Sequence, residues 1–180
     1  RQKLSQNYTV GQLQLANKQT SNDGTVKYLF KLADGQLVES VLMYFKERQS
    51  YSACLSVQVG CAVGCTFCAT AQLGFKRQLS TAEIVEQLHF LQHDAGVAVR
   101  NIVFMGQGEP LLNENNLYPA LEILNQSSEV GMRHITVSTS GIVPAIERLA
   151  QKQLQLTLAV SLHAPNNTLR SQLMPINTKY

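Results

Sequence analysis

The chain lacks the features of a membrane or secreted protein. No apolar stretch approaches the roughly 20 residues that a membrane-spanning helix needs, and the first ten residues, RQKLSQNYTV, contain no apolar core of a signal peptide. There is also no internal repeat and no low-complexity linker. With 180 residues, of which 44% are hydrophobic, the chain is long enough for one domain with a core, or for a piece of a larger protein. We therefore expect a cytoplasmic protein that does not enter a membrane.

Charge is scarce as well. Only 15% of the residues are charged and the formal net charge is +3, which alone is a weak indication of nucleic-acid binding. The surplus is unevenly placed: residues 1–52 contain seven Lys or Arg and four Asp or Glu, whereas residues 53–180 contain eight of each kind. A basic N-terminal segment is compatible with contacts to phosphate and equally with a solvated surface, so both interpretations remain open.

Cysteine is absent outside residues 54–68, where all four cysteines lie. In a reducing cytoplasm, clustered cysteines indicate metal ligands rather than disulfides. Cys61, Cys65 and Cys68 follow the spacing C-x3-C-x2-C in the segment GCAVGCTFCATAQLGF, whose glycines allow a loop to fold tightly around a bound group. Thiolates select zinc, copper(I) or iron–sulfur clusters.

Three cysteine ligands suit one of these groups best. A structural zinc site usually has four protein ligands, and no histidine follows this loop closely. A cubane 4Fe–4S cluster held by three cysteines leaves one iron with an open coordination position. The spacing therefore favours a catalytic three-cysteine cluster, with a zinc site or thiols without a metal as the alternatives.

The N-terminal part of the chain has the pattern of short strands. Two apolar segments, 25–32 and 36–45, flank Asp34-Gly35, which is a hairpin signal. A further apolar segment over 53–59 predicts a strand that leads directly into the cysteine loop. We expect residues 1–52 to form a β-rich accessory extension.

Strands and helices alternate in the remainder. Ser80 and Glu83 form the pattern of a capping box at the start of a helix, and Gly96 is placed to end it. Strands are then predicted over 100–106, 134–141 and 156–164, and helices around 117–124, 144–150 and 168–173. This alternation predicts an α/β fold with a parallel sheet. The sheet of residues 53–180 would be open or rolled into the N-terminal part of a βα barrel, and because MPINTKY adds no closing element, we expect the chain to be truncated.

Polar residues follow the predicted parallel strands, where barrels of this kind carry their chemistry. Gly108 can expose its backbone to a ligand and Glu109 can accept hydrogen bonds from an ammonium group, although an ordinary strand-end turn is the alternative. The third glycine of a dinucleotide fingerprint is missing. Ser138 and Ser161 can donate to a ligand or cap the next helix. His163 is more often a packed imidazole than an acid or base.

Cys54, Glu39 and the Lys76-Arg77 pair are further candidates. Cys54 is typical of a buried small hydrophobe, although its place before the cysteine loop also fits a redox or proton-transfer role. Glu39 alternates with apolar neighbours in its strand, which predicts an exposed side chain. The Lys76-Arg77 pair can contact phosphate or lie on a solvated surface.

Taken together, these motifs resemble those of radical S-adenosylmethionine (SAM) enzymes, and more narrowly those of the RlmN-like adenine methyltransferases that act on 23S ribosomal RNA and tRNA. The resemblance extends from about Thr25 to Tyr180, with several separate motifs in family order. They are VESV, CLSVQVGCAVGCTFCATAQLGF, MGQGEPLLN, TVSTSG, SLHAPNN and LMPIN. The cysteine spacing alone indicates only the superfamily.

The resemblance implies cofactors and the residues that hold them. Cys61, Cys65 and Cys68 would bind a 4Fe–4S cluster whose open iron holds SAM, and a reduced protein such as flavodoxin would donate the electron. The remainder of the implied SAM site comprises Gly108, Glu109, Ser138, Ser161, Leu162 and His163.

The resemblance also implies the reaction, which is methylation of carbon 2 of adenine through a methyl-cysteine intermediate. Cys54 matches the cysteine that resolves the enzyme–RNA adduct by pairing with the methyl-carrying sulfur. Glu39 matches the proton acceptor, although the segment between it and Cys54 is two residues longer than in the family pattern. The methyl-carrying cysteine and a later SAM-binding Asn are absent from this chain. We therefore expect the parent protein to be a monomeric enzyme and this piece alone to be inactive.

Three alternatives remain at this point. A sister family methylates carbon 8 of the same ribosomal adenine and confers antibiotic resistance, although the Gly-Glu-Pro and SLHAP motifs are closer to the carbon-2 family. The second alternative is a radical SAM enzyme that acts on a small substrate and does not bind RNA. The third is a zinc-bound RNA-binding module without catalysis.

Overall fold

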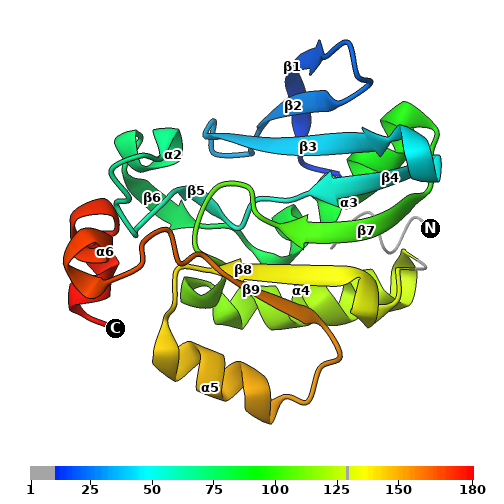
Figure 1. Cartoon of the computed structure of the whole chain (residues 1–180). Coiled ribbons are helices and arrows are strands. Elements are labelled where there is room, and N and C mark those ends of the chain that lie inside the picture. The colour runs from blue at the N-terminus through cyan, green and yellow to red at the C-terminus, as the bar shows by residue number, and fades with distance from the viewer. Residues whose placement is uncertain (1–10, 129) are drawn as a thin grey trace.

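The computed structural model describes residues 11–128 and 130–180, and in these residues the main element is a seven-stranded sheet in the order β1-β2-β3-β4-β7-β8-β9 (Figure 1). Its strands are β1 (Gln14–Thr20), β2 (Val26–Lys31), β3 (Leu37–Phe45), β4 (Ser50–Cys54), β7 (Val99–Phe104), β8 (Ile135–Thr139) and β9 (Thr157–Val160). From β1 to β4 neighbouring strands are antiparallel, and from β4 to β9 they are parallel. The predicted α/β fold with an antiparallel N-terminal extension is confirmed.

The local signals in the sequence position several of these elements. At the predicted hairpin between β2 and β3, Gly35 has a φ of 82° and donates its N–H to Leu32, a conformation that favours glycine. Helix α3 (Thr81–Ala95) begins with the predicted capping box, in which Ser80 and Glu83 each accept from the other's backbone N–H. It ends at Gly96 with a φ of 64°.

The other helices follow the parallel strands in turn. They are α4 (Glu114–Ser127), α5 (Val143–Gln151) and α6 (Asn167–Leu173). The connections contain the short helix α2 (Ala69–Gln72) and the 3-10 turns η1 (Lys46–Arg48), η2 (Pro110–Leu112) and η3 (Met132–His134), and a further 3-10 turn, η4 (Pro175–Thr178), follows α6. None of the helices that the structure describes combines the length and the apolar character that a membrane span requires.

The core lies between one face of the sheet and helices α3, α4 and α5. The ring of Phe90 on α3 packs edge-on against Phe30 of β2, with centroids 5.0 Å apart, and burial of such a side chain contributes roughly 1.5–3 kcal/mol. The sheet residues buried on this face include Tyr28, Phe30, Val38, Leu42, Ala53, Ile102, Phe104, Ile135 and Val137.

The opposite face of the sheet carries a different set of residues, because successive side chains alternate between faces. The register places Val41 beside Cys54, Cys54 beside Val103, and Val103 beside Thr136. Glu39 precedes Val41 by two residues and shares its face. These residues are only partly buried, so this face remains accessible from β3 across to β8.

The predicted strand over 53–59 is wrong as a single element. β4 ends at Cys54, and β5 (Gln58–Gly60) instead pairs with β6 (Phe75–Gln78) in a separate two-stranded sheet of the described chain. The intervening backbone changes partners: the N–H of Leu55 donates to Val103, and that of Val57 to Gln107, in the loop after β7. Cys61, Cys65 and Cys68 therefore lie in the connection between the two strands of a small hairpin.

The seven-stranded sheet continues through residue 52, since β4 pairs with β3 on one side and with β7 on the other. The division into regions 1–52 and 53–180 remains a prediction. Figure 1 shows α2 and α6 together at the end of the molecule where the parallel strands finish, and the polar loops meet at this end.

Candidate functional site

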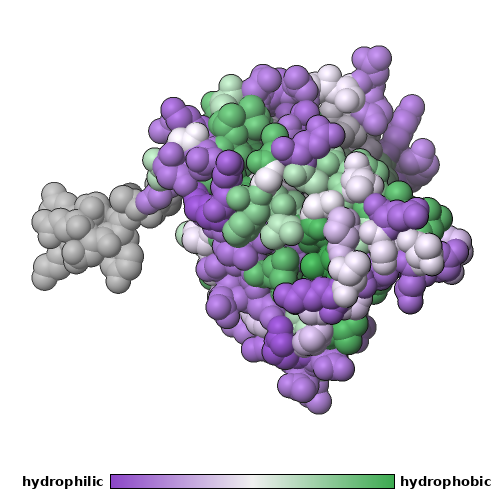
Figure 2. Space-filling model, turned by 90° about the vertical axis from the view of Figure 1, so that its left-hand side faces the viewer, coloured by the Kyte–Doolittle hydropathy of each residue, from purple (hydrophilic) through white to green (hydrophobic). Residues whose placement is uncertain are grey.

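A cavity of about 330 Å³ lies where β7, β8 and β9 end. Figure 2 shows this end of the molecule, with apolar side chains gathered in the middle and polar ones around them. Most of the site residues predicted from the sequence line this one cavity: Cys61, Cys65, Cys68, Gly108, Glu109, Ser138, Ser161 and His163. Leu162 does not line it. Its side chain is 63% exposed, and its carbonyl accepts a hydrogen bond from Arg170.

The cysteine loop is held at both ends by backbone hydrogen bonds. Cys61 donates its N–H to Gly74 across the β5–β6 hairpin, and Thr66 donates to Leu173 at the end of α6. Gly60 is required at the hairpin, because its φ is 73° and an added Cβ would lie 1.7 Å from the Gly74 oxygen. All four cysteines are free, and in the described residues no group of three or more His, Cys, Asp or Glu side chains is arranged to hold a metal ion as it stands.

The environment of the thiols is partly apolar. Burial raises the pKa of Cys61 and of Cys65, and the negative charge of Glu109 and the neighbouring cysteines raise both further. Backbone N–H groups of Val63 and Gly108 oppose this effect at Cys61. A metal group must therefore displace protons from these thiols, as thiolate ligation generally requires.

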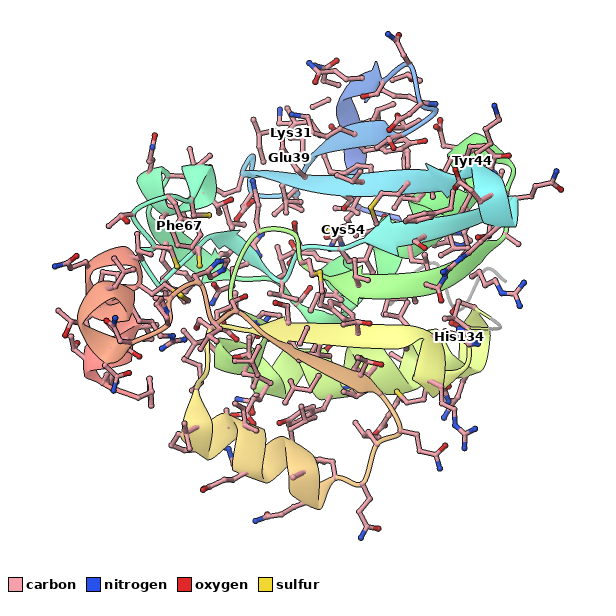
Figure 3. The ribbon with its side chains drawn as sticks, in the orientation of Figure 1. Lys31, Glu39, Tyr44, Cys54, Phe67 and His134 are labelled. Atoms are coloured by element: carbon pink, nitrogen blue, oxygen red, sulfur yellow. The ribbon has the colours of Figure 1, made fainter. Side chains whose placement is uncertain are left out.

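The donor set fits an iron–sulfur cluster. Three thiols, the usual ligands of such clusters, line one cavity that also contains a carboxylate and several hydroxyl groups. The aromatic ring of Phe67, within the loop, lies 4.7 Å from the ring of His163 (centroid to centroid), and Figure 3 shows Phe67 at the end of the molecule that holds α2 and α6. The loop is thereby joined to the segment after β9.

Glu109 carries a buried carboxylate, since the residue is only 4% exposed. Its Oε1 accepts from the N–H of Leu111 at 3.1 Å and its Oε2 from the N–H of Ser140 at 2.6 Å. Among the described residues no Lys, Arg or His forms an ion pair with it. A buried charge without a countercharge is costly, so this carboxylate is suited to a cationic ligand.

Two glutamines that the sequence analysis missed, one buried and one partly buried, connect this carboxylate to the cysteine hairpin. Gln58 of β5 is fully buried and accepts the N–H of Glu109 at 2.9 Å. Its amide nitrogen donates to Gln78 of β6 at 2.9 Å, and Gln78 donates to the carbonyl of Leu112 at 2.7 Å. Gly108 is needed beside this bridge, because its φ is 99° and an added Cβ would lie 2.5 Å from the Gln58 Cβ.

The loops after β8 and β9 are also tied together. Arg170 of α6 is buried, and its guanidinium donates to the carbonyls of Ser140, Ser161 and Leu162. His163 has a φ of 57°, in the left-handed region that is uncommon for residues other than glycine. Arg170 was missed from the sequence because a polar residue on a short helix is normally solvated.

The two remaining predicted residues lie apart from the cavity. Glu39 forms an ion pair with Lys27 at 3.1 Å beside a separate cavity of about 180 Å³. Burial raises the pKa of Cys54, and a hydrogen bond from the backbone of Met105 opposes that shift. Met105 itself lines the main cavity, so Cys54 contacts a residue of the cavity wall without lining the cavity. Figure 3 shows Glu39 and Cys54 on β3 and β4, away from Phe67.

A larger depression of about 920 Å³ lies between the β2–β3 turn and α3. Its charged groups bond to one another: Arg77 donates to Asp34 at 2.6 Å and to Glu83 at 2.8 Å. Both carboxylates raise the pKa of Arg77. Arg77, whose side chain is 33% exposed, is thus paired with two carboxylates at a partly solvated surface, and phosphate contact by the Lys76-Arg77 pair remains a prediction.

Comparison with known proteins agrees with the geometry of the site. The sequence profile of the radical SAM superfamily matches residues 55–180. The chain belongs to this superfamily. Membership implies a 4Fe–4S cluster and SAM as cofactors, as the motifs had predicted.

Individual relatives are similar to this chain over all or nearly all of its length. One from Petrotoga mobilis, curated as a probable dual-specificity RNA methyltransferase RlmN, is 48% identical over 183 residues, or 100% of this chain and 52% of the relative. One of the same name from Thermotoga neapolitana is 47% identical over 98% of this chain and 52% of its own. The chain spans about half the length of these curated relatives.

A solved structure has the same fold. The crystal structure of a radical SAM methyltransferase from Sphaerobacter thermophilus superimposes with a TM-score of 0.92 at 43% sequence identity, and it covers 99% of this chain and 54% of that chain. The resemblance stated from the sequence motifs is therefore confirmed.

Proposed function

We propose that this chain carries the cluster and SAM sites of an RNA methyltransferase that acts on carbon 2 of adenine in 23S rRNA and tRNA. The relatives named RlmN support this assignment. The observation that carries it is the single cavity in which three thiols, an uncompensated buried carboxylate and serine hydroxyls meet.

Cys61, Cys65 and Cys68 would hold the 4Fe–4S cluster. When bound, the cluster supplies single electrons to SAM and thereby gives access to radical chemistry, which methylation of an unreactive aromatic carbon requires. The electron would come from a reduced protein such as flavodoxin, in a monomeric enzyme of the cytoplasm.

The chain's own residues bind and orient SAM. Glu109 accepts hydrogen bonds from the ammonium group, and Gly108 lets the backbone approach because an added Cβ would clash there. Ser138 and Ser161 donate to polar groups of SAM from the ends of neighbouring strands. His163 and the segment around Leu162 close the cavity at the third strand end.

Cys54 and Glu39 take the roles that follow the transfer of the methyl carbon. Glu39 accepts the proton that leaves carbon 2, and Cys54 forms a disulfide with the sulfur of the methyl-carrying cysteine as the enzyme–RNA adduct separates. The chain contains no cysteine after Cys68, so the methyl-carrying cysteine lies outside these 180 residues. Both residues lie on the accessible face of the sheet, which supports contact with a bound base.

Analysis of the reaction product tests this proposal. The full-length protein, reconstituted anaerobically and supplied with SAM, a reductant and 23S rRNA or tRNA transcripts, should yield 2-methyladenosine on nuclease digestion and mass spectrometry. A product methylated at carbon 8 would favour the sister family. SAM cleavage without any RNA product would point to a different substrate.

A further inference from the structure

Ser140 places a buried hydroxyl group in the cavity without a hydrogen-bond partner. The residue is 6% exposed and lines the cavity, and the side-chain oxygen is one of two buried side-chain polar atoms without a partner in the described residues. The other, Oε1 of Gln107, does not belong to a residue lining the cavity. A buried polar atom left unpaired costs free energy, so a ligand atom that forms a hydrogen bond with the Ser140 hydroxyl would recover that cost.

The backbone of Ser140 is fixed on both sides. Its N–H donates to Oε2 of Glu109 at 2.6 Å, and its carbonyl accepts from the buried guanidinium of Arg170. The next N–H, of Gly141, donates to Thr139 Oγ1 at 3.1 Å. The backbone of Ser140 is therefore held beside the carboxylate of Glu109, in the wall of the same cavity.

The composition of the cavity wall indicates which ligand group it meets. An amino-acid head group carries an ammonium and a carboxylate on the same carbon. Glu109 supplies the acceptor for the ammonium, so the carboxylate needs donors close by. Among residues 11–128 and 130–180 no Lys or Arg side chain lines the cavity, which leaves hydroxyl groups as the main donors.

We infer that the Ser140 hydroxyl donates a hydrogen bond to the carboxylate of the amino-acid head group of SAM, and so adds Ser140 to the residues that select the cofactor. This inference rests on the proposed function, since it takes SAM as the ligand of this cavity. It assigns the two ends of the zwitterion to adjacent residues of one hydrogen-bonded unit, Glu109 and Ser140.

Two ligands that differ only in the carboxylate provide the test. SAM and decarboxylated SAM are titrated by equilibrium dialysis against the anaerobically reconstituted full-length protein and its Ser140→Ala variant. A hydrogen bond to a charged group predicts about a tenfold or greater loss of SAM affinity in the variant, with no change for decarboxylated SAM. Ser140→Cys, which keeps the volume but donates weakly, should resemble Ser140→Ala. Ser171→Ala, on α6 outside the cavity, is the control and should bind both ligands like the wild type.

The outcomes separate this inference from the proposed function. If Ser140→Ala binds SAM as tightly as the wild type, or loses affinity for both ligands equally, the hydroxyl does not meet the carboxylate and the inference is wrong while SAM binding stands. If the reconstituted full-length wild type binds no SAM, the proposed function and the inference fail together.

Discussion

Replacing Glu109 by Gln removes the charge of the buried carboxylate while keeping the size of the side chain. The carboxylate accepts two backbone hydrogen bonds, from Leu111 and Ser140. An amide has only one oxygen, so its nitrogen must face one of these N–H donors. Leaving that donor unpaired costs about 1–3 kcal/mol, partly offset because a buried charge no longer has to be desolvated. We expect the free energy of unfolding to fall by roughly 1 kcal/mol.

The effect on SAM binding should be larger. A hydrogen bond between an ammonium group and a carboxylate contributes about 1.5–3 kcal/mol, which corresponds to a ten- to hundredfold weaker Kd for Glu109→Gln. The assay is equilibrium dialysis of SAM against the reconstituted full-length protein, with urea unfolding measured in parallel. Cluster content should stay normal, because Glu109 is not among the proposed ligands.

A matched control comes from Glu114 at the start of α4. Glu114→Gln removes the surface ion pair with Arg148, which should cost at most about 1 kcal/mol of stability and leave SAM binding unchanged. If Glu109→Gln binds SAM with wild-type affinity, Glu109 is only a turn residue and the ligand assignment of the cavity is wrong.

Three further predictions concern the glutamine bridge, the acid range and Cys54. Gln58→Leu removes one buried and one partly buried hydrogen bond and should lower the free energy of unfolding in urea by about 2–3 kcal/mol; a loss below about 0.5 kcal/mol would show that the bridge does not hold the site. Burial would raise the pKa of Glu83, but the hydrogen bonds and charge of Arg77 together with the hydrogen bonds from Ser80 outweigh it and keep the pKa low, and Arg77 also lowers the pKa of Asp34. A lowered folded-state pKa gives stability that is present above the ordinary carboxyl range and lost as the pH falls through the folded value, so Arg77→Met should be less stable than the wild type at pH 7 and converge with it near pH 3. An equal difference at both pH values would contradict this. In the full-length protein, Cys54→Ala should accumulate RNA crosslinked to protein, detected on denaturing gels, and normal turnover would make Cys54 a plain core residue.

The elements that the sequence predicts best are those fixed by local chemistry. The capping box at Ser80 and Glu83 and the Asp34-Gly35 turn depend on neighbours within a few residues, so their position can be read directly. The βα alternation is equally legible, because each buried parallel strand is a continuous apolar run. The break after Cys54 could not be read in this way, since it arises from hydrogen bonds to the loop after β7, about 50 residues away in sequence.

The site divides along the same line. Cys61, Cys65 and Cys68 stand out because their spacing is itself the signal. Gln58 looks like an ordinary polar residue of a strand, and only the fold shows that it is buried and bonded to Glu109. A polar residue inside the apolar segment of a predicted strand was the available signal. Ser140 lay in a recognised motif, but its unpaired hydroxyl depends on burial, which no local pattern reports.

The iron and sulfide content of the reconstituted chain tests the central claim most directly. Anaerobic reconstitution should give a brown protein with about four irons and four acid-labile sulfides per chain. Ala at Cys61, Cys65 or Cys68 should each abolish the cluster, while Cys54→Ala should retain it. Zinc without sulfide in the wild type, or loss of the cluster on changing Cys54 alone, would contradict the account.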